Sequence, residues 1–327
     1  MLPPSPTRAK TARTAWGAGP DPPVYFLGID GGGTRTTVWV ANNRGRILAR
    51  AVAGPSNPTK VGLEAARREI LAATRRARTS AGIRGRRFEA VCAGIAGAAS
   101  ATAHRELLAF LRRSLPARRH ILTHDAAITL EAGLGAAPGV VVISGTGSIA
   151  FGRDRRGRVV RSGGWGSAFG DEGSGYDVGR KAIQAALRDF DGRGPRTGLG
   201  KRICRSLNIS EITEIIARAL TPDQVAALFP VVNRAATQGD RVARRLCEEA
   251  GRDLAELAAP LLRSIGGRRA ARWVVCAGGV FKAGKIVRES FARRLRSLSP
   301  GAKVELLRRE PVEGALALAR TCAGRRL

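Results

Sequence analysis

The sequence predicts an α/β protein built from two domains with a cleft between them. The chain has 327 residues, of which 44% are hydrophobic, and a chain of this length usually forms more than one core. Short apolar runs of strand length alternate with longer stretches of helical periodicity. A strand, a glycine-rich turn and a second strand occur twice, once near the start of each half. This weak duplication favours two similar α/β halves.

The first domain is predicted over residues 24–129. Its strands are apolar runs with aromatic and β-branched residues, and the segment "NNRGR" marks a hairpin turn between the second and third of them. We expect strands at 24–30, 35–41, 46–53, 88–97 and 120–126, and helices at 61–80 and 101–114.

The second domain is predicted over residues 130–327. The segment "GVVVISGTGSIAFGRD" repeats the strand, glycine turn and strand of the opening, and "GRVVRSGGWG" adds a third strand. Helices dominate from about 175 to 265. A strand with a glycine turn at 272–284 and a strand at 303–308 follow, and a closing helix at about 311–323 can pack back on the first domain.

Residues 1–23 are predicted to form a disordered basic tail. They are rich in Pro, Ala and Arg and lack the apolar segment of a secretory signal. No apolar run approaches the ~20 residues that span a bilayer, so no membrane partner is expected. The five cysteines form no closely spaced pair, which argues against a zinc knuckle and favours reduced thiols in the cytoplasm. They are Cys92, Cys204, Cys247, Cys276 and Cys322.

The formal net charge of +30 is the strongest compositional feature, and alone it would suggest a nucleic-acid partner. Only seven of the 56 basic residues are lysine, and the arginines are spread along the whole chain. No basic stretch is interleaved with the stacking aromatics that single-strand binders use. We therefore expect no specific nucleic-acid partner and interpret the charge as compositional bias.

The segment "GIDGGGTRT" predicts a phosphate-binding hairpin tip. It lacks the lysine of a P-loop, and a strand rather than a helix follows the glycines, which excludes the dinucleotide fingerprint. Glycines let a backbone approach anionic oxygens closely. We expect Asp30 to hold Mg²⁺, directly or through water. The phosphate ligands would be Gly31, Gly32, Gly33, Thr34, Arg35 and Thr36, and the alternative is an ordinary glycine-rich hairpin.

A second turn, "SGTGS", repeats this chemistry with Gly145, Thr146, Gly147 and Ser148. Two such turns, one in each domain, can grip a triphosphate from both sides. In "CAGGV", Gly278 and Gly279 follow a strand, where an adenosine could lie flat on the backbone.

Two further segments carry polar groups suited to a substrate. Asp125 in "THDA" could deprotonate a hydroxyl that attacks a γ-phosphate, or it could cap the helix that follows. In "GGWGSAFGDEGSGY", Trp165 fits a sugar-facing surface or ordinary packing. Asp171 and Glu172 could hold ligand hydroxyls or favour the N-terminus of the next helix.

Together these motifs resemble the N-acetylglucosamine kinases and the BadF/BadG/BcrA/BcrD-type ATPases of the actin/Hsp70/sugar-kinase superfamily. The resemblance rests on "GIDGGGTRT", "GPSNP", "HDA", "VISGTGS", "GGWGSAFGDEGSGY" and "CAGGVFKAG" in this order, and it covers residues 24–320. It implies two actin-like (ribonuclease H-like) domains with an ATP and substrate cleft between them. It also implies transfer of the γ-phosphate of ATP, with Mg²⁺, to the 6-hydroxyl of an amino sugar.

The resemblance also implies roles for single residues. Asp125 resembles the catalytic base and Asn57 the sugar-binding asparagine. Ala226 and Ala283 would lie near the adenosine site. Further sugar contacts would come from Gly164, Trp165, Gly166 and Asp171. Ile149 stands where the animal-type kinases carry a polar residue that helps to hold the sugar. The resemblance therefore does not determine which sugar is bound.

Two other functions use the same scaffold. One is an ATPase that activates a partner dehydratase through an iron–sulfur cluster held between two subunits, and this chain has no closely spaced cysteines for such a cluster. The other is a non-catalytic regulatory protein. A homodimer is compatible with each of these possible functions.

Overall fold

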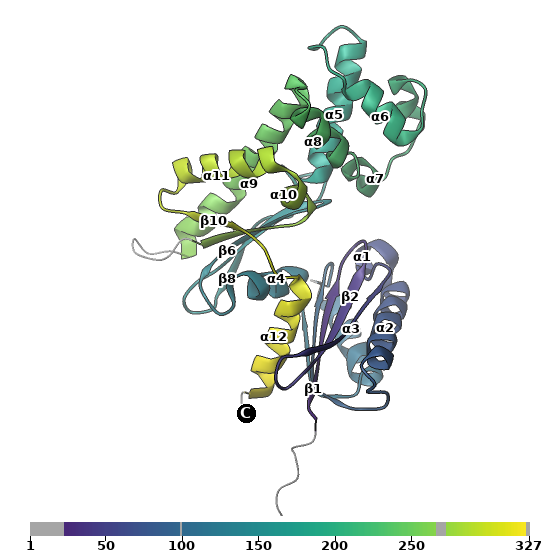
Figure 1. The fold of residues 1–327 in the computed structure, drawn as a ribbon, viewed down its shortest axis with the longest axis vertical. Coiled ribbons are helices and arrows are strands. Elements are labelled where there is room, and N and C mark those ends of the chain that lie inside the picture. Colours follow the sequence, from purple (N-terminus) through teal and green to yellow (C-terminus); the bar gives the residue numbers. More distant parts are fainter. Residues whose placement is uncertain (1–22, 99, 266–272, 325–327) are drawn as a thin grey trace, which may run out of the picture.

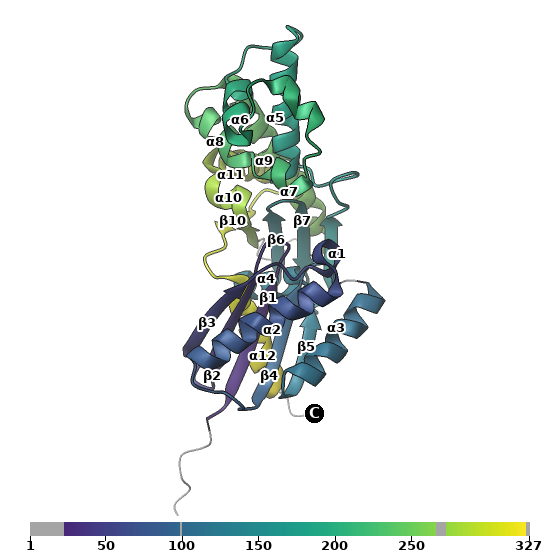
Figure 2. The same cartoon turned by 90° about the vertical axis from the view of Figure 1, so that its right-hand side faces the viewer.

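The computed structural model describes residues 23–98, 100–265 and 273–324, so the predicted N-terminal tail lies outside the described residues. Two five-stranded sheets lie one above the other in Figure 1, with the N-terminal sheet at the bottom. A helical region extends beyond the second sheet at the far end of the molecule (Figure 2).

The first sheet has the strand order β3-β2-β1-β4-β5. Strands β3, β2 and β1 are antiparallel neighbours, whereas β1, β4 and β5 run parallel. Helices α2 and α3 bury their apolar residues against one face of this sheet. The bounds are β1 Tyr25–Gly31, β2 Thr36–Asn42, β3 Ile47–Ala53, α1 Pro58–Val61, α2 Leu63–Ser80, β4 Phe88–Ile95, α3 Ala101–Ser114 and β5 Ala117–Thr123.

The second sheet repeats this topology with the order β8-β7-β6-β9-β10. Again three strands are antiparallel and the next two pair in parallel. Helices α9 and α11 pack against one face. The bounds are β6 Gly139–Ser144, β7 Ser148–Arg153, β8 Val159–Gly163, α9 Arg241–Ile265, β9 Trp273–Ala277, α10 Gly279–Ala283, α11 Lys285–Leu298 and β10 Lys303–Leu306.

The remaining helices of the second half follow β8 and form the region at the top of Figure 1. Their apolar residues join the same core as α9 and α11, so this region is continuous with the second half. Their bounds are α5 Gly175–Phe190, α6 Leu199–Leu207, the 3₁₀ helix η1 Ile212–Ala217, α7 Pro222–Ala226 and α8 Phe229–Thr237.

Helix α4 (Asp125–Leu134) lies between the two sheets. Its Ile128 packs in the core of the first sheet, and its Leu130 and Ala132 pack against β6 and β9 of the second. The closing helix α12 (Pro311–Gly324) returns to the first sheet and packs on α4 and β1. Gly314 allows this approach, because a Cβ there would overlap the carbonyl oxygen of Ile128.

The predicted strands and helices occur in the predicted order, with ends shifted by a few residues. One boundary was wrong in a way that matters. The strand expected at 120–126 ends at Thr123, and Asp125 is the first residue of α4 rather than the end of a strand. In the described ranges, no helix is long and apolar enough to cross a membrane.

Candidate active site

The first glycine turn is the tip of the β1–β2 hairpin, because Gly31 pairs with Thr36 and leaves residues 32–35 as the turn. The carbonyl of Gly32 accepts hydrogen bonds from the backbone N–H groups of Ser56 (3.0 Å) and Asn57 (3.1 Å). The tip is thereby joined to the segment that leads into α1. The hairpin form of this turn, predicted from the sequence, is confirmed.

The side chains of this tip differ in what they offer a ligand. Thr34 and Arg35 are exposed. Thr36 departs from the expectation, because it is fully buried and its hydroxyl lies 2.7 Å from Gly54 O and 2.8 Å from Ser56 Oγ. A buried hydroxyl with partners inside the fold holds β3 in place and does not face a phosphate.

The second glycine turn is the tip of the β6–β7 hairpin, where Ser144 pairs with Ser148. The start of α5 lies against it, since the N–H of Gly175 donates to Gly145 O at 2.8 Å and that of Tyr176 to Thr146 O at 3.2 Å. The two glycine turns therefore occupy equivalent places in two sheets of the same topology.

Asp171, a predicted sugar contact, lies against this second tip. Its Oδ1 accepts the N–H of Ser148 at 3.1 Å, and a Cβ on Gly147 would lie 2.8 Å from its Oδ2. Asp171 has a φ of 64°, a conformation that few non-glycine residues adopt. The Ser148 hydroxyl donates to Glu172 O at 2.7 Å. Both donors of Ser148 are thus used within the protein, which departs from its predicted contact with phosphate.

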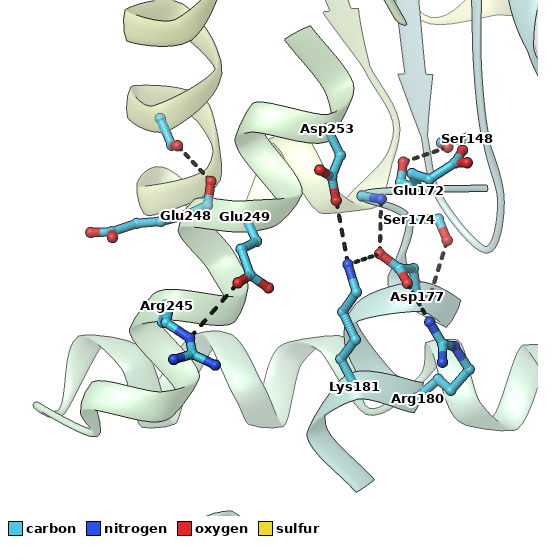
Figure 3. A network of polar contacts seen from close by, with 12 residues as sticks. Ser148, Glu172, Ser174, Asp177, Arg180, Lys181, Arg245, Glu248, Glu249 and Asp253 are labelled. Atoms are coloured by element: carbon cyan, nitrogen blue, oxygen red, sulfur yellow. Dashed lines mark hydrogen bonds and ion pairs between the residues drawn. The ribbon is translucent and has the colours of Figure 1, made fainter. Parts of the chain in front are cut away.

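A polar network fixes the segment that carries Asp171 to the helices behind it (Figure 3). The carboxylate of Asp177 accepts the N–H of Gly173 at 3.1 Å and pairs with Lys181 at 2.7 Å. Lys181 also reaches Asp253 of α9 at 3.3 Å. Asp177 and Lys181 both lie on α5, so the buried Asp177 fixes the backbone at Gly173 to the start of α5, and Lys181 fixes α5 to α9.

The predicted adenosine segment lies beside the second hairpin. Gly278 has a φ of 96°, and a Cβ there would overlap the carbonyl of Ser144, so the fold itself requires this glycine. A Cβ at Gly145 or Gly279 would meet no atom within 4 Å. Ala226 lies next to Gly175, and Ala283 O accepts a hydrogen bond from Asn233 at 3.2 Å. Gly145 and Gly279 therefore leave their backbone accessible without serving the packing.

Two carboxyl groups lie at the same edge of the first sheet, because Asp30 aligns with Gly94 of β4, Gly94 aligns with Thr123 at the end of β5, and Asp125 follows two residues later. Burial, reinforced by the nearby charge of Asp125, raises the pKa of Asp30 to about 7, with Arg35 opposing and Glu310 adding to the shift. Burial also raises the pKa of Asp125, opposed by its hydrogen bond from the Ala126 N–H at 3.0 Å. Neither carboxylate is therefore held strongly in its charged form.

Asp125 does not cap the helix that follows it. The N-cap of α4 is His124, whose Nδ1 accepts the N–H of Ala127 at 3.2 Å, and its ring stacks on Phe151 with centroids 5.1 Å apart. Burial lowers the pKa of His124, which keeps the imidazole neutral and able to accept this bond. The capping interpretation of Asp125 was wrong, because its neighbour takes that role.

With this geometry in view, comparison with known proteins identifies the family. The chain matches the BadF/BadG/BcrA/BcrD ATPase family over residues 27–319. This protein belongs to that family. It is 34% identical to the N-acetylmuramic acid/N-acetylglucosamine kinase of Clostridium acetobutylicum, over 91% of this chain and 98% of that protein. It is 27% identical to the N-acetyl-D-glucosamine kinase of Dictyostelium discoideum, over 90% of this chain and 97% of that protein.

Solved structures agree with the family assignment. A protein from Chromobacterium violaceum superposes with a TM-score of 0.77 at 27% identity, covering 90% of this chain and 99% of that one. The ROK family glucokinase of Streptomyces griseus, solved with glucose and AMPPNP, gives a TM-score of 0.59 at 20% identity, covering 91% of this chain and 99% of that one. The predicted fold, two actin-like α/β halves as in the sugar kinases, is confirmed.

The remaining predicted sugar contacts of this family member lie on two segments. Asn57 caps α1, and its Oδ1 accepts bonds from the N–H (3.0 Å) and hydroxyl (2.7 Å) of Thr59. Trp165 is 64% exposed between Gly164 and Gly166, which both have positive φ. The exposed indole leaves both interpretations of Trp165 from the sequence as predictions, a sugar-facing surface and ordinary packing.

Sequence reasoning missed several residues of this region. Arg161 on β8 lies over the Trp165 ring at 4.5 Å, and Phe169 is 87% exposed on the same loop. Arg161 pairs with Phe151 across the sheet, so the two share the face on which His124 stacks. Lys60 and Asp223, which form an ion pair at 2.8 Å, were also missed. Their separation of 163 positions gave no local signal.

The residues present fit a magnesium ion that arrives with a nucleotide. Mg²⁺ is commonly held by one or two carboxylates together with phosphate oxygens and water. Asp30 could supply such a carboxylate, and a cation there would offset the burial and the nearby charge of Asp125 that raise its pKa. Among the residues that the structure describes, no group of three or more His, Cys, Asp or Glu could hold a metal by itself.

Proposed function

We propose that this protein is an ATP-dependent sugar kinase that phosphorylates the 6-hydroxyl of an amino sugar, N-acetylglucosamine or N-acetylmuramic acid. One observation carries the proposal. Asp125 follows β5 at the sheet edge where Asp30 and the first glycine tip end β1, and His124 rather than Asp125 caps α4. The sugars are those named for the relatives in Clostridium and Dictyostelium.

Asp125 would act as the general base. Burial raises the pKa of Asp125 toward neutral pH, and a carboxylate with a higher pKa accepts a hydroxyl proton more readily. The sugar oxygen would attack the γ-phosphorus while its proton passes to the Asp125 carboxylate. The bond between the γ-phosphorus and the β,γ-bridging oxygen breaks, and its electron pair leaves with ADP. Asp30 would hold Mg²⁺, which when bound neutralises charge on the transferred phosphoryl group.

The two hairpin tips would bind the phosphates of ATP. Gly32, Gly33 and the exposed Thr34 and Arg35 supply the first side, and Gly145, Thr146 and Gly147 the second. The accessible backbone at Gly279 suits an adenosine lying against it, with Ala226 and Ala283 nearby. Glycine at these positions lets ligand atoms approach the backbone.

The sugar would bind between Asn57 and the loop that carries Gly164, Trp165 and Gly166. Exposed aromatic faces are suited to the apolar faces of sugar rings. The guanidinium of Arg161 above Trp165 adds a positive charge there. That charge would favour a sugar bearing a carboxylate, as N-acetylmuramic acid does.

Sugar-dependent release of ADP from ATP and Mg²⁺ tests this proposal across a panel of amino sugars and their carboxylated derivatives. Asp125→Asn keeps the size of the side chain and should lower kcat by about 10²–10⁴-fold while ATP still binds. Asp191→Asn, on the exposed C-cap of α5, is the matched control and should keep full activity. Turnover by Asp125→Asn at the wild-type rate, or no sugar-dependent turnover by the wild type, would contradict the proposal.

No observation favours the dehydratase-activator alternative. Cys92, Cys247 and Cys276 are buried in β4, α9 and β9, where burial raises the pKa of each thiol and disfavours a metal-binding thiolate. The five free cysteines suit a reducing compartment, so we place this kinase in the cytoplasm. We retain the expectation of no specific nucleic-acid partner, and a homodimer remains compatible with the proposal.

A further inference from the structure

One lysine joins the two hairpin tips. The aliphatic chain of Lys60 runs over the first tip, where a Cβ on Gly33 would lie 3.0 Å from its Cδ. Its Nζ lies 2.8 Å and 3.0 Å from the two carboxylate oxygens of Asp223 on α7. The hydroxyl of Thr146, on the second tip, donates to the same Asp223 carboxylate at 2.9 Å.

The Asp223 carboxylate therefore lies where donors from both halves converge. An ammonium group and a hydroxyl directed at one carboxylate form a site for an oxyanion, and phosphate oxygens bind the same donors. These donors also hold the pKa of Asp223 below its usual range, in spite of an opposing effect of burial. The carboxylate is thus a protein anion held by two donors that lie at the two predicted phosphate-binding tips.

A permanent positive charge near the tips would favour phosphate binding. Burial raises the pKa of Asp30, Asp125 and Asp171, and each of these groups would repel a triphosphate in its ionised form. Burial raises the pKa of Asp171, and the positive charge of Lys60 opposes this shift. Lys60 therefore lies against the first tip, its ammonium group contacts Asp223 of the second half, and its charge also acts on Asp171 beside the second tip.

We propose that Lys60 binds the terminal phosphate of ATP and that Asp223 holds Lys60 in the nucleotide-free protein. On ATP binding, the ammonium group of Lys60 and the hydroxyl of Thr146 exchange the Asp223 carboxylate for phosphate oxygens. This inference rests on the proposed function, since it takes the two hairpin tips as the phosphate site.

The exchange is energetically accessible. The side chains of Lys60 and Asp223 are 37% and 52% exposed, and ion pairs this open to water contribute little to stability. A terminal phosphate carries more negative charge than a carboxylate and offers three oxygens, so it competes well for the same ammonium group. Asp223 thus acts against ATP in two ways, because it occupies Lys60 and it repels the incoming anion.

The test is equilibrium binding of ATP and ADP, with Mg²⁺ and without sugar, followed by a fluorescent nucleotide. Lys60→Met should weaken ATP binding by about 10- to 100-fold and ADP binding by less than about threefold, because only ATP has the terminal phosphate. Lys60→Arg should restore part of the loss. Asp223→Asn should bind ATP at least as tightly as the wild type.

Lys201→Met, on the exposed side of α6, is the matched control and should leave both affinities unchanged. The proposal is overturned if Lys60→Met and Asp223→Asn weaken ATP binding equally, which would make the pair a brace between the halves. It is also overturned if Lys60→Met affects ATP and ADP alike or neither. Wild-type protein that binds ATP but phosphorylates no sugar would sink the proposed function and leave this inference standing, whereas no ATP binding at all would overturn both.

Discussion

The two glycine hairpins have the same place in two sheets of one topology, yet their surroundings differ. At the first tip, Thr34 and Arg35 are exposed, and the tip is anchored through the Gly32 carbonyl. At the second tip, the Asp171 carboxylate takes the N–H of Ser148, and the Asp223 carboxylate takes the hydroxyl of Thr146.

This difference teaches how one motif can serve two tasks. At the first tip, the side chains of Thr34 and Arg35 are exposed, so they can bind an anion without first breaking a contact with a protein carboxylate. The second tip already binds the protein's own carboxylates, and phosphate would have to replace at least one of them. Duplicated glycine turns therefore need not act alike, because neighbours from distant parts of the chain set the donors that remain.

The largest expected difference between the two halves is in the cost of adding a methyl group at the end of a central strand, β9 beside the second hairpin or β1 of the first. Gly278→Ala would force a Cβ into the rigid backbone of Ser144 at a φ of 96°, and we expect a loss of about 3 kcal/mol or more in the free energy of unfolding. Gly31→Ala would meet side-chain atoms, Ile95 Cδ1 and Ser56 Oγ, both 2.5 Å away, which can shift. We expect about 1–2 kcal/mol there.

Denaturant unfolding of both variants measures this difference. Gly279→Ala is the matched control, since its Cβ would meet no atom within 4 Å, and it should keep the wild-type stability while weakening ATP binding. Equal losses for Gly278→Ala and Gly31→Ala would show that the ends of β9 and β1 tolerate an added Cβ equally.

Stability should depend on pH at the first hairpin because burial raises the pKa of Asp30. The pKa of Asp30 is about 7 in the folded protein against 3.8 for an ordinary aspartate, so between these values the folded state holds a proton that the unfolded state has lost. The free energy of unfolding should therefore fall as pH rises through this window. Without added divalent cation, Asp30→Asn should be more stable than the wild type at pH 8 by roughly 1–3 kcal/mol.

Thermal and denaturant unfolding between pH 5 and pH 8 follow this effect. The extra free energy of unfolding of Asp30→Asn over the wild type should shrink toward pH 5. The Mg²⁺-dependent turnover of this variant should be lost at every pH. A constant difference between the two proteins across this range would mean that Asp30 ionises freely in the folded state.

The smallest expected effect concerns Asp171 at the second hairpin. Asp171→Ala removes the acceptor of the Ser148 N–H, and we expect a loss of about 1–2 kcal/mol in stability with a rise of the KM for ATP. Asp171→Asn keeps an acceptor and tolerates the positive φ, so it should behave nearly as the wild type. Steady-state kinetics decide the role, because a raised KM for the sugar with an unchanged KM for ATP would restore the direct sugar contact expected from the sequence.

Sequence reasoning predicted the fold well because its signals are local. Strands, hairpin tips and helices follow from patterns within about ten residues, and the duplicated hairpins gave the two-sheet architecture. The error at Asp125 was also local in origin. Two adjacent residues, His124 and Asp125, could each cap a helix, and only the observed start of α4 shows that His124 does so.

By itself, the sequence determined the two glycine tips, the order of strands and helices and the family to which the chain belongs. Only the tertiary structure decided which donors at those tips are engaged. Thr36 turned inward, Asp171 turned toward Ser148, and Lys60 met Asp223 across 163 positions of the chain. The physical reason is that a hydrogen bond or ion pair depends on distances in space, and residue spacing along a chain fixes those distances only within one element.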